Sequence, residues 1–201
     1  MFVDQNQLLD THEGAKYLLG CVLFCQNTKA RFVIMETESY HYTDEACHAF
    51  NNKKTLRNEI MFNKAGFLYV YQLYGMHLCM NVVSGKKDEG SAILIRGLLP
   101  LDHLQDVQKR RARFDEASIL CNGPGKVAQG VGVAKEDNGL YLLDLNSRFQ
   151  LYRKEKNTKI GKLIYSKRVG ITKNTHKLWR FGLDSITINQ KKMAYKPTVI
   201  W

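Results

Sequence analysis

Two carboxylates and a tyrosine stand at the end of an apolar run, in the string RFVIMETESY at 31–40. Because the side chains of a strand alternate between its two faces, Glu36, Glu38 and Tyr40 share one face. A buried core rejects paired carboxylates, whereas the wall of a cleft accepts them, and a carboxylate there can act as a general base. An exposed strand end would show the same pattern without any chemistry, so this string alone leaves both interpretations open.

Arg96 interrupts a second apolar strand, in SAILIRGLLP at 91–100. A guanidinium in such surroundings is costly unless it is paired, so we expect a carboxylate partner, either Glu36 or Glu38. The pair could serve the chemistry of a cleft or could be a structural ion pair without chemistry.

An aromatic residue at a tight turn is the third unusual feature. The string GFLYVYQLYGMHLCMNVV at 66–83 forms two β-rich runs around Tyr74 and Gly75. It predicts a hairpin whose glycine supplies the positive φ of the turn. Proteins that enter the DNA minor groove insert such side chains as wedges between base pairs. A tyrosine folded back onto its own hairpin is the alternative.

The charge distribution favours a polyanion as partner. The formal net charge is +11, and residues 148–201 carry 14 Lys and Arg against 2 Asp and Glu, while residues 1–147 carry 16 against 17. Such a basic field is typical of proteins that bind nucleic acid. A solvated basic surface without a specific partner would have the same composition.

The elements that must position these residues are short and mixed, which predicts an α+β fold in a single compact domain over 1–201. The expected elements are a mostly helical segment 4–27, the strand 31–40, a short helix over about 44–50, the hairpin 66–83, the strand 91–100, a basic helix 101–114, a glycine-rich turn and helix at 123–133, and then the short strands LYLLDL, FQLYR, LIYSKRVGI and DSITIN.

Composition excludes several classes of protein. With 44% hydrophobic and 24% charged residues among 201, the chain is typical of a globular domain. It has no apolar run of the ~20 residues that span a bilayer, and it does not start like a signal peptide. Five scattered cysteines predict no disulfide framework and indicate the reducing cytoplasm. The missing P-loop spacing argues against nucleotide hydrolysis, and the missing HExxH motif argues against a zinc hydrolase. We expect neither a metal nor a cofactor.

Together these strings resemble the alkyladenine (3-methyladenine) DNA glycosylases of the mammalian alkylpurine type. The resemblance is carried, in family order over about residues 8–186, by ETESYHYTDEACHAF, TLRNEIMF, GFLYVYQLYGMHLCMNV, AILIRGLLPL, NGPGKVAQ, RVGI and WRFGLDS. The final residues, MAYKPTVIW, match nothing in the family pattern. The resemblance implies a curved antiparallel sheet with flanking helices and a protruding β-hairpin.

The resemblance assigns catalytic roles to three residues. Glu38 matches the general base that deprotonates the water attacking the sugar C1′. Arg96 matches the arginine that helps to hold this carboxylate and the water. Val169, in the string RVGI, matches the residue whose backbone carbonyl contacts the same water.

Four further residues match the pocket for the extruded base. Tyr40, His48 and Tyr71 match residues that stack on this base and form hydrogen bonds to it. Asn81 matches the residue that crowds the 2-amino group of guanine and so excludes it.

Five residues match positions that contact the DNA duplex. Tyr74 matches the wedge that fills the gap left by the extruded base, with Gly75 and Met76 beside it on the hairpin. Arg57 and Lys126 match positions that contact the DNA backbone.

These assignments predict a monofunctional DNA glycosylase that removes alkylated or deaminated purines, of the 3-methyladenine, 7-methylguanine and hypoxanthine class, and leaves an abasic site. The expected partner is double-stranded DNA with damaged purines, bound by a monomer in the cytoplasm, at the nucleoid in a bacterium and not at a membrane. Two alternatives remain. One is a non-catalytic module that binds damaged DNA with the same hairpin wedge, and the other is a nucleosidase acting on small molecules.

The wedge assignment makes a prediction about Tyr74. In Tyr74→Ser the ring that stacks in the vacated space is lost, so we expect weaker capture of the extruded base. Non-specific, salt-dependent binding to the phosphates should stay nearly intact. Base-analogue fluorescence measures the flipping equilibrium, and an equilibrium equal to that of the unaltered protein would contradict the wedge role.

Overall fold

The strand that ends in the two carboxylates, β2 (Arg31–Tyr40), is central to a nine-stranded sheet in the computed structural model, which describes residues 1–73 and 75–197. One edge of β2 pairs along nearly its whole length with β5 (Ala92–Pro100). Its other edge is shared, because the first half pairs with β1 (Val22–Cys25) and the second half with β10 (Arg180–Leu183). These ladders are all antiparallel, which confirms the α+β class with a mainly antiparallel sheet.

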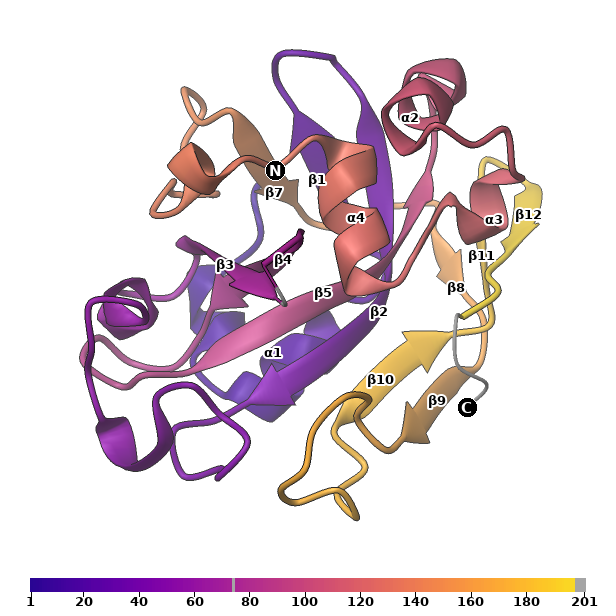
Figure 1. Ribbon diagram of the computed structural model, residues 1–201. Coiled ribbons are helices and arrows are strands. Elements are labelled where there is room, and N and C mark those ends of the chain that lie inside the picture. Colours follow the sequence, from indigo (N-terminus) through magenta and orange to yellow (C-terminus); the bar gives the residue numbers. More distant parts are fainter. Residues whose placement is uncertain (74, 198–201) are drawn as a thin grey trace.

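The main path of this sheet runs β3-β4-β5-β2-β1-β7, and β9 extends it beyond β10 (Figure 1). The other strands of the sheet are β3 (Leu68–Leu73), β4 (His77–Val83), β6 (Cys121–Asn122), β7 (Phe149–Tyr152) and β9 (Leu163–Ser166). A smaller sheet has the order β12-β11-β8, formed by β8 (Lys159–Ile160), β11 (Ser185–Ile188) and β12 (Lys191–Ala194). The hairpin predicted over 66–83 is therefore confirmed as β3 and β4.

Helices cover both faces of the large sheet. In Figure 1, α4 (Pro124–Val131) lies in front of β4 and β5, and α1 (Thr11–Tyr17) lies behind β2 and β5. Thr37 points to the rear, since its Oγ1 donates to the backbone carbonyl of Ala15 in α1 at 2.9 Å. Strand alternation leaves Glu36 and Glu38 on the front face. The remaining helical segments are η1 (Gln5–Leu8), η2 (Phe50–Asn52), η3 (Glu59–Phe62), α2 (Leu104–Arg111), α3 (Ala117–Leu120) and η4 (Lys135–Asp137).

The core is built from the apolar runs of β1, β2 and β5 together with α1 and α4. All nine residues of β5 are buried, so Arg96 does lie in an apolar strand and is only 6% exposed. The five cysteines are buried and free. No helix among the described residues is both long enough and apolar enough to cross a membrane.

The prediction of a mostly helical segment 4–27 is confirmed as far as Tyr17, by η1 and α1, and is wrong beyond it. After the seven-residue α1, the chain turns at Gly20, whose φ is +84°, and continues as β1. Strand β1 pairs with β2 on one edge and with β7 on the other. These long-range hydrogen bonds override the helical spacing of Leu23.

The helix predicted over 44–50 and the strand predicted for LYLLDL are also wrong. Residues 44–50 form turns, because the Asp44 carboxylate accepts the N–H of Ala46 (3.2 Å) in a local turn rather than capping a helix. LYLLDL forms a single bridge, between Tyr141 and Phe67, and otherwise turns. Strands β6, β8, β10 and β12 were not predicted, whereas the strands 31–40 and 91–100 and the helices α2 and α4 are confirmed.

The start of α1 yields a stability prediction. Asp10 caps this helix, because its Oδ1 accepts the N–H groups of His12 and Glu13, both at 2.9 Å. We expect Asp10→Ala to lower the free energy of unfolding by about 1 kcal/mol at pH 7, measured by urea denaturation.

The pH dependence and a conservative variant provide the control. The hydrogen bond from the Glu13 N–H is the main cause that lowers the pKa of Asp10, so the cap stabilises above the ordinary Asp range and is lost as the pH falls through the lowered pKa. Asp10→Asn keeps an acceptor and should lose only a small part of this stability at pH 7. Equal stability of Asp10→Ala and the unaltered protein at pH 7 would exclude the capping contribution.

Candidate active site

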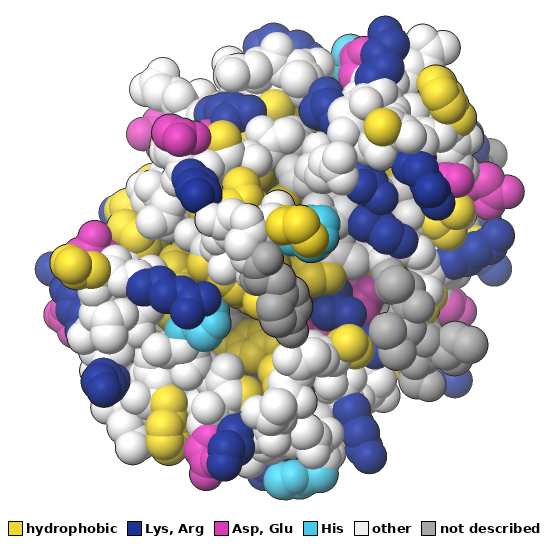
Figure 2. Space-filling view, in the orientation of Figure 1, with side chains coloured by type: hydrophobic (Ala, Val, Ile, Leu, Met, Phe, Trp, Pro, Cys, Tyr) yellow, Lys and Arg dark blue, Asp and Glu magenta, His cyan; other side chains and the backbone are white. Residues whose placement is uncertain are grey.

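A cavity of about 470 Å³ opens between the β3–β4 hairpin, β5, the start of α4 and the loop 169–173. Figure 2 shows a hollow with a hydrophobic lining on this face and Lys and Arg side chains around it. The volume is in the range of small-molecule sites, about 300–1,000 Å³. Half of the residues assigned from the sequence line this cavity, namely Tyr40, His48, Tyr71, Asn81, Arg96 and Val169.

The carboxylate of Glu38 is held by three groups that line the cavity. The backbone N–H of Val169 donates to its Oε1 at 2.9 Å, and the Tyr40 hydroxyl donates to its Oε2 at 2.8 Å. The Arg96 Nη1 lies 3.5 Å from Oε1. Since the side chain of Glu38 is 0% exposed, its carboxylate lies directly behind the cavity wall. The N–H contact of Val169 was not predicted, because the resemblance assigned only its carbonyl.

This burial changes the acidity of Glu38. Loss of water raises the pKa of Glu38, and the nearby charge of Glu36 adds to the rise. The charge of Arg96 and the hydrogen bonds from Val169 and Tyr40 oppose the effect without cancelling it. A carboxylate whose pKa lies closer to neutrality is a stronger base than an ordinary glutamate, and it is still ionised above that pKa.

Arg96 has carboxylate partners, as its position in an apolar strand predicted. Its Nε lies 3.0 Å from the Oε1 of Glu36, and its Nη1 faces Glu38. Glu36 Oε1 also accepts a hydrogen bond from the Nε of Arg180 at 2.7 Å. The four side chains form a buried network of two negative and two positive charges, in which each charge has a partner of opposite sign.

Aromatic rings form one wall of the cavity. The rings of His48 and Tyr71 meet edge to face with centroids 4.6 Å apart, and the Nδ1 of His48 lies 3.0 Å from the Tyr69 hydroxyl. His48 retains exposed surface, yet the surrounding rings and then the charge of Arg57 lower its pKa to about 4. At neutral pH it is therefore an uncharged hydrogen-bonding ring. Tyr69 was not among the predicted site residues, although strand alternation places it on the same face of β3 as Tyr71.

Asn81 lies on β4 and lines the cavity beside these aromatic rings. Its Nδ2 donates to the backbone carbonyl of Tyr69 at 3.0 Å, across the hairpin. This bond holds the side chain against the cavity, so its position there does not depend on a ligand.

The residues assigned to the DNA duplex lie around the cavity and not in it. Gly75 has a φ of +69° with open space where a Cβ would be, and Met76 is 78% exposed, so this part of the hairpin reaches into solvent. Arg57 is exposed, with its guanidinium 5.8 Å from the centroid of Tyr71. Lys126 is half-buried at the start of α4 and donates to the Asn122 side chain at 2.8 Å. Tyr74 lies outside the described residues.

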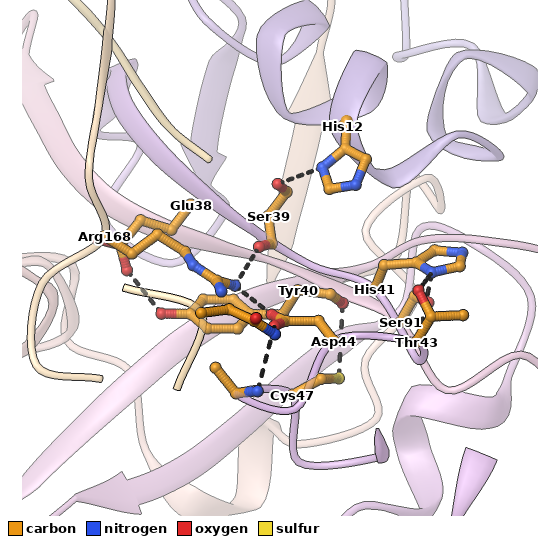
Figure 3. Close-up of polar contacts among 12 residues, drawn as sticks. His12, Glu38, Ser39, Tyr40, His41, Thr43, Asp44, Cys47, Ser91 and Arg168 are labelled. Atoms are coloured by element: carbon orange, nitrogen blue, oxygen red, sulfur yellow. Dashed lines mark hydrogen bonds and ion pairs between the residues drawn. The ribbon is translucent and has the colours of Figure 1, made fainter. Parts of the chain in front are cut away.

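Sequence reasoning missed a second buried ion pair, between Arg168 and Asp44. Arg168 Nη1 donates to both the Asp44 carboxylate and the backbone carbonyl of Ser39, and its guanidinium lies 4.6 Å from the ring centroid of Tyr40. Figure 3 shows these residues together at the end of β2. The pair connects the loop that carries His48 with the loop that carries Val169. Both residues stand inside the strings TDEACHAF and RVGI, but their types alone indicated no role.

The surroundings of Asp44 favour its charged form. Burial alone would raise the pKa of Asp44, but the hydrogen bonds from Arg168 and Asn174 outweigh it and hold this pKa below its usual value. Asn174 Nδ2 donates to the Oδ1 of Asp44 at 2.8 Å.

No cluster of three or more His, Cys, Asp or Glu suited to a metal ion is found in the described part of the chain.

This arrangement places a cavity with an aromatic wall in front of a buried carboxylate whose pKa is raised. A cavity of this kind can enclose one flat aromatic ring, and with a net charge of +11 it is typical of a hydrolase that acts on nucleic acid, as the DNA glycosylases do.

Comparison with known proteins leads to the same class. Residues 5–186 match the methylpurine-DNA glycosylase (MPG) family. A protein of Rhodopseudomonas palustris (strain ATCC BAA-98 / CGA009) is 43% identical over 172 residues, covering 86% of this chain and 79% of its own length. A protein of Francisella tularensis subsp. tularensis (strain FSC 198) is 38% identical over 187 residues, covering 91% and 95%. Both are named "Putative 3-methyladenine DNA glycosylase".

The chain therefore belongs to the methylpurine-DNA glycosylase family, which confirms the family inferred from the sequence strings. It is a DNA glycosylase, a hydrolase of DNA repair, and not a module that only binds damaged DNA.

The raised pKa of Glu38 predicts the pH dependence of base release. Below this pKa the carboxyl is protonated and cannot accept a proton, so the single-turnover rate should fall on the acid side with a midpoint above the ordinary Glu value of about 4.3. His48, with its pKa lowered to about 4, stays neutral over that range. Rates measured from pH 4 to pH 8 test this expectation, and a plateau that persists down to pH 4 would contradict it.

Proposed function

We propose that this protein excises alkylated or deaminated purines, of the 3-methyladenine, 7-methylguanine and hypoxanthine class, from double-stranded DNA and leaves an abasic site. Water activated by Glu38 hydrolyses the N-glycosidic bond. The observation that carries the proposal is the buried Glu38 carboxylate, held by Val169, Tyr40 and Arg96 directly behind an aromatic cavity. The names of the relatives refer to 3-methyladenine, which makes that lesion the first substrate to test.

The cavity supports recognition of a base that has left the duplex. A base inside the stack is out of reach, so it must rotate out, and this costs less for a damaged or mispaired base. Tyr71 and His48 offer aromatic surfaces to it, and π-faces attract the positive charge that 3-methyladenine and 7-methylguanine carry. Asn81 then acts against guanine by crowding its 2-amino group, in line with its fixed position on the cavity floor.

In the reaction at the sugar, Glu38 has two roles. Cleavage of the N-glycosidic bond passes through an oxocarbenium-like state, so a nearby carboxylate stabilises the developing positive charge and also takes a proton from the attacking water. Arg96 opposes protonation of Glu38, and the Val169 N–H orients one of its oxygens. In this proposal the Val169 carbonyl contacts the same water. Alkylated purines already carry positive charge and leave easily, so they require no strong general acid.

Contacts with the duplex are proposed to come from the hairpin and the basic surface. Tyr74 fills the gap left by the base, Gly75 and Met76 lie beside it, and Arg57 and Lys126 contact phosphates. The excess of Lys and Arg over residues 148–201 supplies non-specific affinity that weakens with salt, through counterion release. We further propose that the protein acts as a monomer on nucleoid DNA in the cytoplasm, and light scattering with and without duplex tests the monomer.

The variant Glu38→Gln tests the reaction itself. The amide keeps the size of the side chain but cannot accept a proton, so turnover should fall by about 10²–10⁴ while duplex binding persists. Chromatography of the base released from duplex DNA containing 3-methyladenine measures the first quantity, and a mobility shift measures the second. Near-normal turnover in Glu38→Gln would remove Glu38 from the general-base role.

Two controls accompany this experiment. Glu45 lines the same cavity but is exposed and lies 4.0 Å from Lys173, so Glu45→Gln should retain turnover. Borohydride should trap no covalent enzyme–DNA adduct, because water is the nucleophile. Cleavage of free nucleosides as fast as duplex DNA would favour the nucleosidase alternative.

A further inference from the structure

The end of the chain reaches the charged network behind Glu38, although it lies beyond the residues that match the family, 5–186. After β12 the chain turns inward, and the backbone N–H of Tyr195 donates to the Asp184 carbonyl at 2.9 Å. The Asn122 side chain then donates to the Lys196 carbonyl at 2.8 Å. These bonds bring Tyr195 into the interior, where it is only 5% exposed.

The hydroxyl of Tyr195 is part of the ion-pair network. It donates to the Oε2 of Glu36 at 2.8 Å, while Glu36 Oε1 faces Arg96 at 3.0 Å and Arg180 at 2.7 Å. Arg96 also faces Glu38 at 3.5 Å. An unbroken series of contacts therefore runs from Tyr195 through Glu36 and Arg96 to Glu38.

Gly97 provides the space for this hydroxyl. A Cβ at position 97 would lie 1.9 Å from the Tyr195 oxygen and 2.9 Å from the Cβ of Glu36. Gly97 pairs with Glu36 across the β2–β5 ladder, at the irregularity of that ladder, and with Asn122 in β6. Because Gly97 has no side chain, the Tyr195 hydroxyl can lie against the backbone of β5. Any larger residue at position 97 would occupy the place of this hydroxyl.

We propose that Tyr195 is a positioning residue for the reaction, because its hydrogen bond to Glu36 leaves Arg96 free to be shared with Glu38. This inference rests on the proposed role of Glu38 as the general base. Tyr195 does not touch the substrate, and it acts only through Glu36 and Arg96.

The groups around the two carboxylates explain why loss of the Tyr195 hydroxyl should raise the pKa of Glu38. Glu36 faces Arg96 from β5, Arg180 from β10 and the Tyr195 hydroxyl, whereas Glu38 faces Arg96, the Tyr40 hydroxyl, the Val169 N–H and, on its own strand, Glu36.

Without the hydroxyl, Glu36 loses one donor and attracts the guanidinium of Arg96 more strongly. Less of the Arg96 charge then acts on Glu38, and the pKa of Glu38 rises further. Burial and the charge of Glu36 raise the pKa of Tyr195 well above its usual value, so the hydroxyl keeps its proton.

The variants Tyr195→Phe and Tyr152→Phe test the inference together. Tyr152 is the matched control, because its half-buried hydroxyl donates to Gln150 at 2.5 Å, far from Glu38 along the sheet path. The first measurement is the single-turnover rate of base release from pH 4 to pH 8. The second is the ¹³C titration of the Glu38 carboxyl, assigned with Glu38→Gln. The latter requires no activity.

We expect Tyr195→Phe to raise the midpoint of both titrations by about 0.5–1 pH unit, which lowers the rate on the acid limb by about 3- to 10-fold. Duplex binding should not change. Tyr152→Phe should coincide with the unaltered protein in both measurements. The inference would be overturned if Tyr195→Phe had the same two titration midpoints as Tyr152→Phe, even if both variants were less stable to heat.

The two measurements also separate this inference from the proposed function. If the carboxyl titration moves in Tyr195→Phe but even the unaltered protein releases no base, the link from Tyr195 to Glu38 stands, whereas the proposed function fails and with it any role of this link in the reaction. If the unaltered protein releases base, Glu38→Gln does not, and neither titration moves in Tyr195→Phe, the inference alone fails.

Discussion

The guanidinium of Arg96 allows two carboxylates to lie close together in a closed interior. Glu36 and Glu38 are both fully buried, and two negative charges without partners there would be protonated or would unfold the strand. Arg96 and Arg180 balance them, so the network carries no net formal charge. The division is unequal, because Glu36 has two cations close by, whereas Glu38 has a single, more distant contact with Arg96. Burial raises the pKa of Glu38, and this single contact with Arg96 opposes the rise without cancelling it.

The fold separates this charged layer from the aromatic cavity that would receive a base. Thr37 faces α1 on one side of β2, and the carboxylates lie on the side of the cavity. One strand therefore packs against a helix with one face and carries the two carboxylates on the other. The Arg168–Asp44 pair joins the two loops that close the cavity, and its guanidinium lies against the ring of Tyr40, one of the donors to Glu38. In the proposed function, uncharged His48 leaves the π-faces of the wall available to a cationic purine.

Prediction from the sequence succeeded where local periodicity and tertiary packing agree. The strands around Glu38 and Arg96 and the hairpin around Gly75 were predicted from apolar and β-rich runs, and the structure keeps all three. Prediction failed over 22–25, where residues at helical spacing form β1, because pairing of β1 on both edges supplies hydrogen bonds that a single-sequence pattern does not reveal. It failed again over 44–50, where turns replace the expected helix and the Asp44 carboxylate binds a buried arginine from 124 positions away.

The sequence by itself determined the family, the α+β class and the six predicted residues that line the cavity, because these depend on short strings whose residue types carry the chemistry. Tertiary structure alone decided how each carboxylate of the pair is held. Glu36 and Glu38 have the same side chain and lie on the same strand face, and apart from the nearby Tyr40 hydroxyl on Glu38 they differ in the groups that distant segments bring to them. Arg180, Val169 and Tyr195 come from far along the chain, and Tyr195 lies beyond the family match, so spacing could not reveal their contacts. A pKa is a property of the surroundings of a group, and those surroundings exist only after folding.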